Sequence, residues 1–108
     1  MTADRRKALY EAFKHKGIEP DVSFLLLNAG DALALIHKGI SEGLLLAGVE
    51  GFIVTDEGAY QPREEYSNDY AEFDGTRADF VTMTEKLVEK GGSAGIRFEV
   101  VFEVSETH

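Results

Sequence analysis

The last part of the chain, residues 96–104 (IRFEVVFEV), alternates between apolar and charged side chains. The apolar side chains on one face of such an extended segment are Ile96, Phe98, Val100, Phe102 and Val104, and the charged side chains on the other face are Arg97, Glu99 and Glu103. A period of two is typical of a β-strand with one face buried and the other in water. The chain must therefore build a sheet whose apolar face is covered by other elements.

Three segments have the pattern of helices: residues 2–16, residues 31–38, and a segment from Asp74 or Thr76 to Lys90. Asp31 is expected to cap the second helix. The apolar side chains that share a face of the third helix are Phe80, Met83, Leu87 and Val88. The glycines that follow the three segments are Gly17, Gly39 and the pair Gly91 and Gly92. Because glycine commonly ends a helix, we expect the helices to stop there, with Gly17 in the left-handed conformation.

Residues 43–62 are predicted to be extended chain with a turn at 56–59. Gly48 and Gly51 favour a bulge or a close approach of two backbones, and Pro62 limits any strand there to a sheet edge. The run from Phe24 to Leu27 fits either a short strand or a helical turn. These patterns predict a small α/β (α+β) fold, one domain over residues 1–108, with a sheet covered by about three helices and a C-terminal β-strand.

Most of the charge lies in one segment. The 108 residues carry a net charge of −9, and residues 50–74 hold eight acids against one base, Arg63, which gives −7. The same segment contains three of the four tyrosines, Tyr60, Tyr66 and Tyr70. Negative charge disfavours nucleic acid and anionic membranes as partners, because both repel it. It favours a basic protein as partner.

Tyrosines among acids indicate a binding surface more than a solubilising one. A tyrosine ring offers a large contact area with little rotamer entropy to lose, so it slows dissociation, whereas charge speeds encounter. For Tyr60, the alternative of packing on the sheet with its hydroxyl in water is favoured; for Tyr66 and Tyr70, interface and core are equally favoured. A binding surface requires that these rings and carboxylates face outward together.

No catalytic site is predicted. The chain has no cysteine, so it lacks a thiol nucleophile and a thiolate metal site. His15 and His37 each lie in the last turn of a predicted helix, where positive charge complements the helix dipole. We expect a non-enzymatic protein without cofactor or metal, although the carboxylates leave open a small metal-dependent enzyme. A third class is a housekeeping homo-oligomer whose tyrosines lie between subunits.

Residues 31–104 carry a family-like order of motifs: Gly39-Ile40 after a helix, the run Ala47-Gly48-Val49-Glu50, and then Pro62, Tyr66 and Asn68. This order resembles the immunity proteins of bacterial polymorphic-toxin systems, in particular the group called immunity protein 40. The resemblance implies an inhibitor that binds a cognate toxin and catalyses no reaction.

Composition and resemblance lead to one hypothesis: an immunity protein, as a monomer or homodimer, that neutralises a basic and plausibly nuclease-type toxin. The residues expected to bind the partner are Glu57, Tyr60, Glu64, Glu65, Tyr66, Asn68, Asp69 and Tyr70. The polar N-terminal residues do not resemble a signal peptide, and no apolar run approaches the roughly 20 residues that span a bilayer. A cytoplasmic location is therefore expected.

Overall fold

A three-stranded antiparallel sheet in the order β4-β3-β5 forms the centre of the molecule. The computed structural model describes residues 2–21 and 24–103. Its elements are α1 (Thr2–Phe13), the 3-10 turn η1 (Lys14–Lys16), β1 (Ile18–Asp21), β2 (Phe24–Leu26), α2 (Ala29–Ser41), β3 (Leu46–Val54), β4 (Tyr60–Asp69), the 3-10 turn η2 (Tyr70–Glu72), α3 (Arg77–Ser93) and β5 (Arg97–Phe102). The fold is a small α+β domain, as the sequence predicts.

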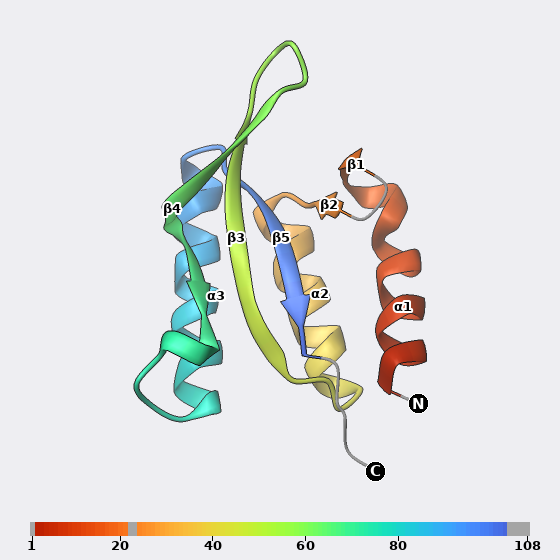
Figure 1. Cartoon of the computed structure of the whole chain (residues 1–108), viewed down its shortest axis with the longest axis vertical. Coiled ribbons are helices and arrows are strands. Elements are labelled where there is room, and N and C mark those ends of the chain that lie inside the picture. The colour runs from red at the N-terminus through yellow and green to blue at the C-terminus, as the bar shows by residue number, and fades with distance from the viewer. Residues whose placement is uncertain (1, 22–23, 104–108) are drawn as a thin grey trace.

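Helices α2 and α3 cover one face of this sheet, and Figure 1 shows both helices behind the strands. The predicted alternation in the last strand is confirmed: Phe98, Val100 and Phe102 are buried towards the helices. Val104 lies outside the described residues. We call the opposite face of the β4-β3-β5 sheet the open face.

Two glycines inside helices pack directly against aromatic rings of β5. A Cβ built on Gly39 in α2 would lie 2.3 Å from a ring carbon of Phe102, and one built on Gly91 in α3 would lie 2.5 Å from a ring carbon of Phe98. The prediction that these glycines end their helices is therefore wrong. They allow each helix to lie close to the sheet, and α2 and α3 continue to Ser41 and Ser93.

Three other local predictions are corrected by packing and capping. Gly17 has an extended φ of −129° instead of a left-handed one, and a side chain there would meet Leu26. Asn28, not Asp31, caps α2, because its side-chain oxygen accepts a hydrogen bond from the Asp31 amide at 2.8 Å. Met83 is 49% exposed, while Thr84 takes the buried position next to it on α3.

The remaining local predictions fit the structure. The segment that fitted either a strand or a helical turn is a strand, β2 (Phe24–Leu26). Thr76, one of the two predicted caps, begins α3, since its hydroxyl oxygen accepts a hydrogen bond from the Asp79 amide. A turn joins β3 to β4 at residues 55–59, with Gly58 at a φ of 86°. Pro62 lies on β4, which is an edge strand of the sheet.

A large bulge interrupts β4 where Gly48 and Gly51 predicted an irregularity. Val49 pairs with Asn68 and Gly51 pairs with Arg63, so four β4 residues, 64–67, face only Glu50 of β3. The Ser67 hydroxyl closes the neck of the bulge by donating to the Arg63 carbonyl oxygen at 2.8 Å and accepting from the Gly51 amide at 3.1 Å. The bulge shapes the open face of the sheet.

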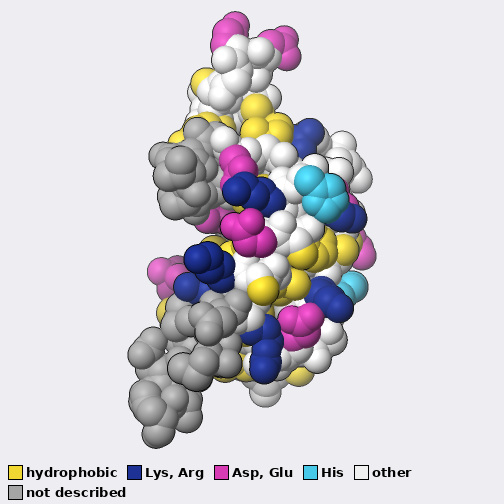
Figure 2. Space-filling model, turned by 90° about the vertical axis from the view of Figure 1, so that its right-hand side faces the viewer, with side chains coloured by type: hydrophobic (Ala, Val, Ile, Leu, Met, Phe, Trp, Pro, Cys, Tyr) yellow, Lys and Arg dark blue, Asp and Glu magenta, His cyan; other side chains and the backbone are white. Residues whose placement is uncertain are grey.

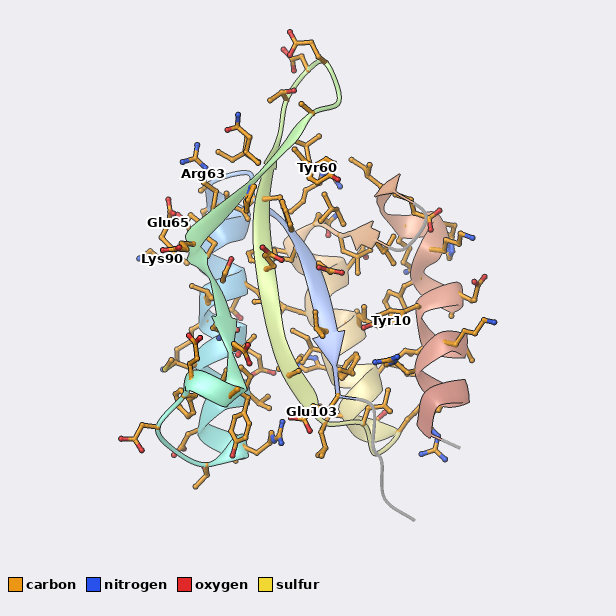
Figure 3. The ribbon with its side chains drawn as sticks, in the orientation of Figure 1. Tyr10, Tyr60, Arg63, Glu65, Lys90 and Glu103 are labelled. Carbon is orange, nitrogen blue, oxygen red and sulfur yellow. The ribbon has the colours of Figure 1, made fainter. Side chains whose placement is uncertain are left out.

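Side chains from α1 cover the outer edge of β5. The Tyr10 hydroxyl donates to the Val100 carbonyl oxygen at 2.7 Å, and an Arg6 guanidinium nitrogen donates to the Phe102 carbonyl oxygen at 3.1 Å. Closer to the start of β5, Leu27 exchanges two backbone hydrogen bonds with Phe98. Figure 3 shows Tyr10 pointing from α1 towards β5.

Candidate functional site

A shallow pocket lies on the open face beside the β4 bulge, with a volume of ≈ 640 Å³. Its walls come from β3, β4, β5 and η2, so the hairpin and its bulge determine its shape. The residues that line it are Ala47, Gly48, Val49, Glu50, Pro62, Glu64, Ser67, Asn68, Asp69, Glu72 and Val101. Four of these residues carry carboxylates, and none is basic. We call this hollow the acidic pocket.

A pair of glutamates occupies the centre of the open face. Glu50 on β3 lies directly opposite Glu99 on β5. Their neighbours Val49 and Val100 are buried on the helix side, and alternation therefore directs both glutamates to the open face. Burial, and then the charge of Glu50, raises the pKa of Glu99 above its usual value of 4.5. Like charges directly opposite each other destabilise a sheet, so this pair favours an incoming cation.

Among the described residues, no base forms an ion pair with a carboxylate of the acidic pocket or with Glu99. The ion pairs found among residues 2–21 and 24–103 are His37–Glu85, Lys38–Glu42 and Arg77–Glu103. None of them includes a carboxylate of the acidic pocket or Glu99. Arg97 shares this face of β5 with Glu99 by alternation, but it takes part in none of these ion pairs. Negative potential on this face is thus left for a partner to offset.

Three of the eight predicted site residues line the acidic pocket: Glu64, Asn68 and Asp69. Asp69 is exposed and also caps η2, because one of its carboxylate oxygens accepts a hydrogen bond from the Ala71 amide at 2.9 Å. Glu57 lies in the turn at the hairpin tip, which projects beyond the helices in Figure 1. Tyr60 is 38% exposed and packs edge-on against Phe52 near that tip, with ring centroids 5.7 Å apart.

Tyr66 and Asn68 both make side-chain contacts with α3, contrary to the expectation of one outward surface. Tyr66 is half-buried against the core, and its ring would lie 3.2 Å from a Cβ on Gly91 of α3. Asn68 donates to the buried Thr84 hydroxyl of α3 at 2.8 Å. These side chains attach β4 to α3, which is the physical reason for their inward direction.

Tyr70 also packs inward, at the start of α3. Its ring meets Phe80 edge-on with centroids 5.3 Å apart, and the Arg77 guanidinium carbon lies 3.8 Å from the ring centroid. Such a stacked cation stabilises the ring in place. Tyr66 and Tyr70 thus pack against the core, which was one of the two alternatives for them, and they do not face outward together with the carboxylates.

Glu65 lies on the other side of the bulge from Glu64. Glu65 is exposed and does not line the acidic pocket; it is labelled on β4 in Figure 3. Three carboxylates of the open face were not among the predicted site residues: Glu50, Glu72 and Glu99. Glu50 and Glu72 belong to the acidic segment, and the alternation of residues 96–104 already placed Glu99 on the polar face.

Within residues 2–21 and 24–103, no three His, Asp or Glu side chains form a group that could hold a metal ion. No helix in these ranges is long and apolar enough to cross a membrane.

Comparison of the chain with protein-family models, with curated proteins and with solved structures finds no match.

Proposed function

We propose that this chain is a non-catalytic binding protein that captures a basic protein through the open face of its sheet. The observation that carries the proposal is the acidic pocket, whose four carboxylates take part in none of the ion pairs of the described residues. Such a surface attracts a cationic partner and speeds its encounter. An immunity protein that covers the basic active site of a toxin is the biological form that the sequence resemblance favours.

The lining of the acidic pocket supports different roles for its residues. Val101 and Pro62 give the pocket apolar walls, while its carboxylates lie around them. An arginine or lysine side chain of the partner fits this combination, because its methylene groups pack on apolar walls and its charged end meets carboxylates. Tyr60, exposed near the hairpin tip, would provide a second contact further along the ribbon.

The test compares two variants with the same change in net charge. One carries Glu50→Gln, Glu64→Gln and Glu72→Gln on the open face. The matched control carries Glu19→Gln, Glu65→Gln and Glu89→Gln, which are equally exposed and lie outside the acidic pocket. Each variant is used to capture basic proteins from the source cells, and association and dissociation rates of the captured protein are measured at low and physiological salt.

We expect the open-face variant to lose the captured protein and the control to retain it. Association should slow by about tenfold or more in the open-face variant at low salt, because local potential controls the encounter. For an immunity protein, the wild type should also abolish the activity of the captured protein. Equal binding by both variants would reject the open face as the binding surface.

A further inference from the structure

The open face has an exposed apolar centre, on the side of the sheet opposite α2 and α3. Val101 on β5 is 39% exposed and lies opposite Gly48 on β3. Together with Ala47 and Pro62 it lines the acidic pocket. Figure 1 shows α2 and α3 running along the strands on the far side, with α1 beside β5. A partner that covers this centre would remove apolar surface from water, which favours docking on the face itself.

Neither outer strand of the sheet leaves a complete row of backbone groups for a partner strand. On β4, Pro62 lacks an amide hydrogen and residues 64–67 form the bulge. On β5, the Val100 and Phe102 carbonyl oxygens accept from α1 side chains, and Leu27 forms a bridge to the same strand. A partner segment on the open face must therefore satisfy its own backbone groups. A helix meets this requirement, since its amide and carbonyl groups bond within the helix.

The neutral polar groups of the acidic pocket are engaged inside the protein. The Ser67 hydroxyl bonds backbone groups at the neck of the bulge. The Asn68 side chain donates to the Thr84 hydroxyl and accepts from the Val49 amide. The carboxylates remain to meet a partner, and they form their strongest hydrogen bonds with charged donors such as arginine and lysine.

The spacing of apolar and acidic positions on the open face matches the rise of a helix. The Gly48–Val101 pair and the Glu50–Glu99 pair are two residues apart along the strands, which is about 7 Å. Four residues of an α-helix rise about 6 Å. A helix that runs along the strands, as α2 and α3 do on the other face, would place an apolar side chain over Val101 and a base four positions away near Glu50 and Glu99 (Figure 1).

The charge of the open face selects a basic helix. Five carboxylates, the four of the acidic pocket and Glu99, share this face with Arg97, the base of β5. The side formed by α1 is mixed instead, because Lys and Arg side chains lie there among Asp and Glu (Figure 2). We propose that the open face receives an amphipathic basic helix of the partner, which presents an apolar side chain and an arginine or lysine four positions apart. This role rests on the proposed function, because it names the element that the basic partner offers to the same face.

Three fluorescein-labelled peptides of equal composition and charge test the helix by fluorescence anisotropy at physiological salt. Each has about 18 residues, a length at which an alanine-rich helix forms in water. The first has leucine and arginine four positions apart along one face, and the second has the same residues dispersed around the helix. The third keeps the order of the first but has D-alanine in its centre, which disfavours a right-handed helix. We expect the first to bind about tenfold more tightly than the others, because it alone brings apolar and charged groups to the face together.

Two neutral substitutions locate the apolar contact. Val101→Thr keeps a β-branched side chain but makes it polar. Met83→Gln is the matched control, since Met83 is 49% exposed on α3, outside the open face. Val101→Thr should weaken binding of the first peptide about three- to fivefold. Met83→Gln should stay within about twofold of wild type. Equal affinities for the two variants would refute a helix seated over Val101.

The outcomes distinguish the helix from the proposed function. Equal binding of the three peptides, lost in the variant with Glu50→Gln, Glu64→Gln and Glu72→Gln, would overturn the helix and leave the open face as the surface for a basic protein. Tighter binding of the third peptide would overturn the helix in favour of an extended segment. Binding that is indifferent to the three glutamate substitutions would overturn the open face itself. Absence of binding by all three peptides would overturn the helix, while the captured protein would still decide the open face by its loss in the same variant.

Discussion

Replacing Gly39 with alanine should destabilise the protein, although alanine is the better helix former. A Cβ at this position would lie 2.3, 2.6 and 2.9 Å from three ring carbons of Phe102, all inside the 3.0 Å that real Cβ atoms essentially never cross. The ring must therefore move by about 1 Å to restore ordinary contact. Phe102 is 1% exposed and belongs to the hydrophobic core, so this movement disturbs other packed side chains.

The magnitude follows from two opposing effects. Overpacking a well-packed core costs ~1–3 kcal/mol, and three simultaneous close contacts favour the upper half of that range. Alanine regains up to ~1 kcal/mol over glycine inside a helix. The expected net loss in the free energy of unfolding is ~1–2 kcal/mol, or roughly 5–15 °C in Tm for a domain of this size.

The same helix offers a matched control in Gly30→Ala. A Cβ on Gly30 would meet only the Asn28 side-chain oxygen, at 3.6 Å, which is ordinary contact. This substitution should raise the free energy of unfolding by ~0.5–1 kcal/mol. Urea unfolding followed by circular dichroism measures both variants, and two identical changes in one helix should move the midpoint in opposite directions.

A second substitution tests the assigned cause. Phe102→Leu alone shortens a buried side chain and should destabilise the protein, but it should remove most of the penalty of Gly39→Ala in the double variant. A Gly39→Ala protein as stable as Gly30→Ala would refute the reasoning that Phe102 requires glycine at this position.

Three further predictions concern the sheet and the N-cap of α2. Because the pKa of Glu99 is raised, the folded state binds more protons than the unfolded state above pH 4.5, and stability falls as pH rises through the folded pKa. Glu99→Gln should then stabilise the protein at pH 7 by ~0.2–1 kcal/mol and have little effect below pH 4. An equal gain at both pH values would contradict repulsion between Glu99 and Glu50 as the cause. Ser67→Ala should lower the free energy of unfolding by ~1 kcal/mol and speed hydrogen exchange of the Gly51 amide. An unchanged exchange rate would contradict the role of the Ser67 hydroxyl. Asn28→Ala should cost ~1 kcal/mol in thermal unfolding and Asn28→Asp much less, since aspartate retains the capping oxygen.

The sequence allowed correct prediction of the features that depend on local chemistry. Alternation in residues 96–104 predicted a half-buried strand, and Gly48 and Gly51 predicted the irregular pairing of β3 with β4. Pro62 correctly predicted an edge strand, because the lack of an amide hydrogen is a property of proline itself and needs no knowledge of distant residues.

Features that depend on a distant partner were not predicted. Gly39 resembles a helix stop in the sequence, and only the Phe102 ring, 63 positions later, explains a glycine inside α2. The acidic segment likewise does not show that Tyr66 and Tyr70 turn towards α3, because a four-residue bulge changes the direction of side chains along β4. The position of Glu99 opposite Glu50 could not be predicted, because it depends on the register between β3 and β5.

The two outer strands of the sheet are protected by different means, and this difference limits how the protein can aggregate. On β4, Pro62 and the bulge at residues 64–67 permanently break the row of backbone groups that another strand would need. On β5, Tyr10 and Arg6 of α1 donate to the Val100 and Phe102 carbonyl oxygens, and Leu27 exchanges two backbone hydrogen bonds with Phe98. Growth of a fibril requires every molecule to offer two complementary edges. In the β4-β3-β5 sheet, one edge is broken and the other is covered by α1 and Leu27, so neither is a continuous template for a strand of a second molecule.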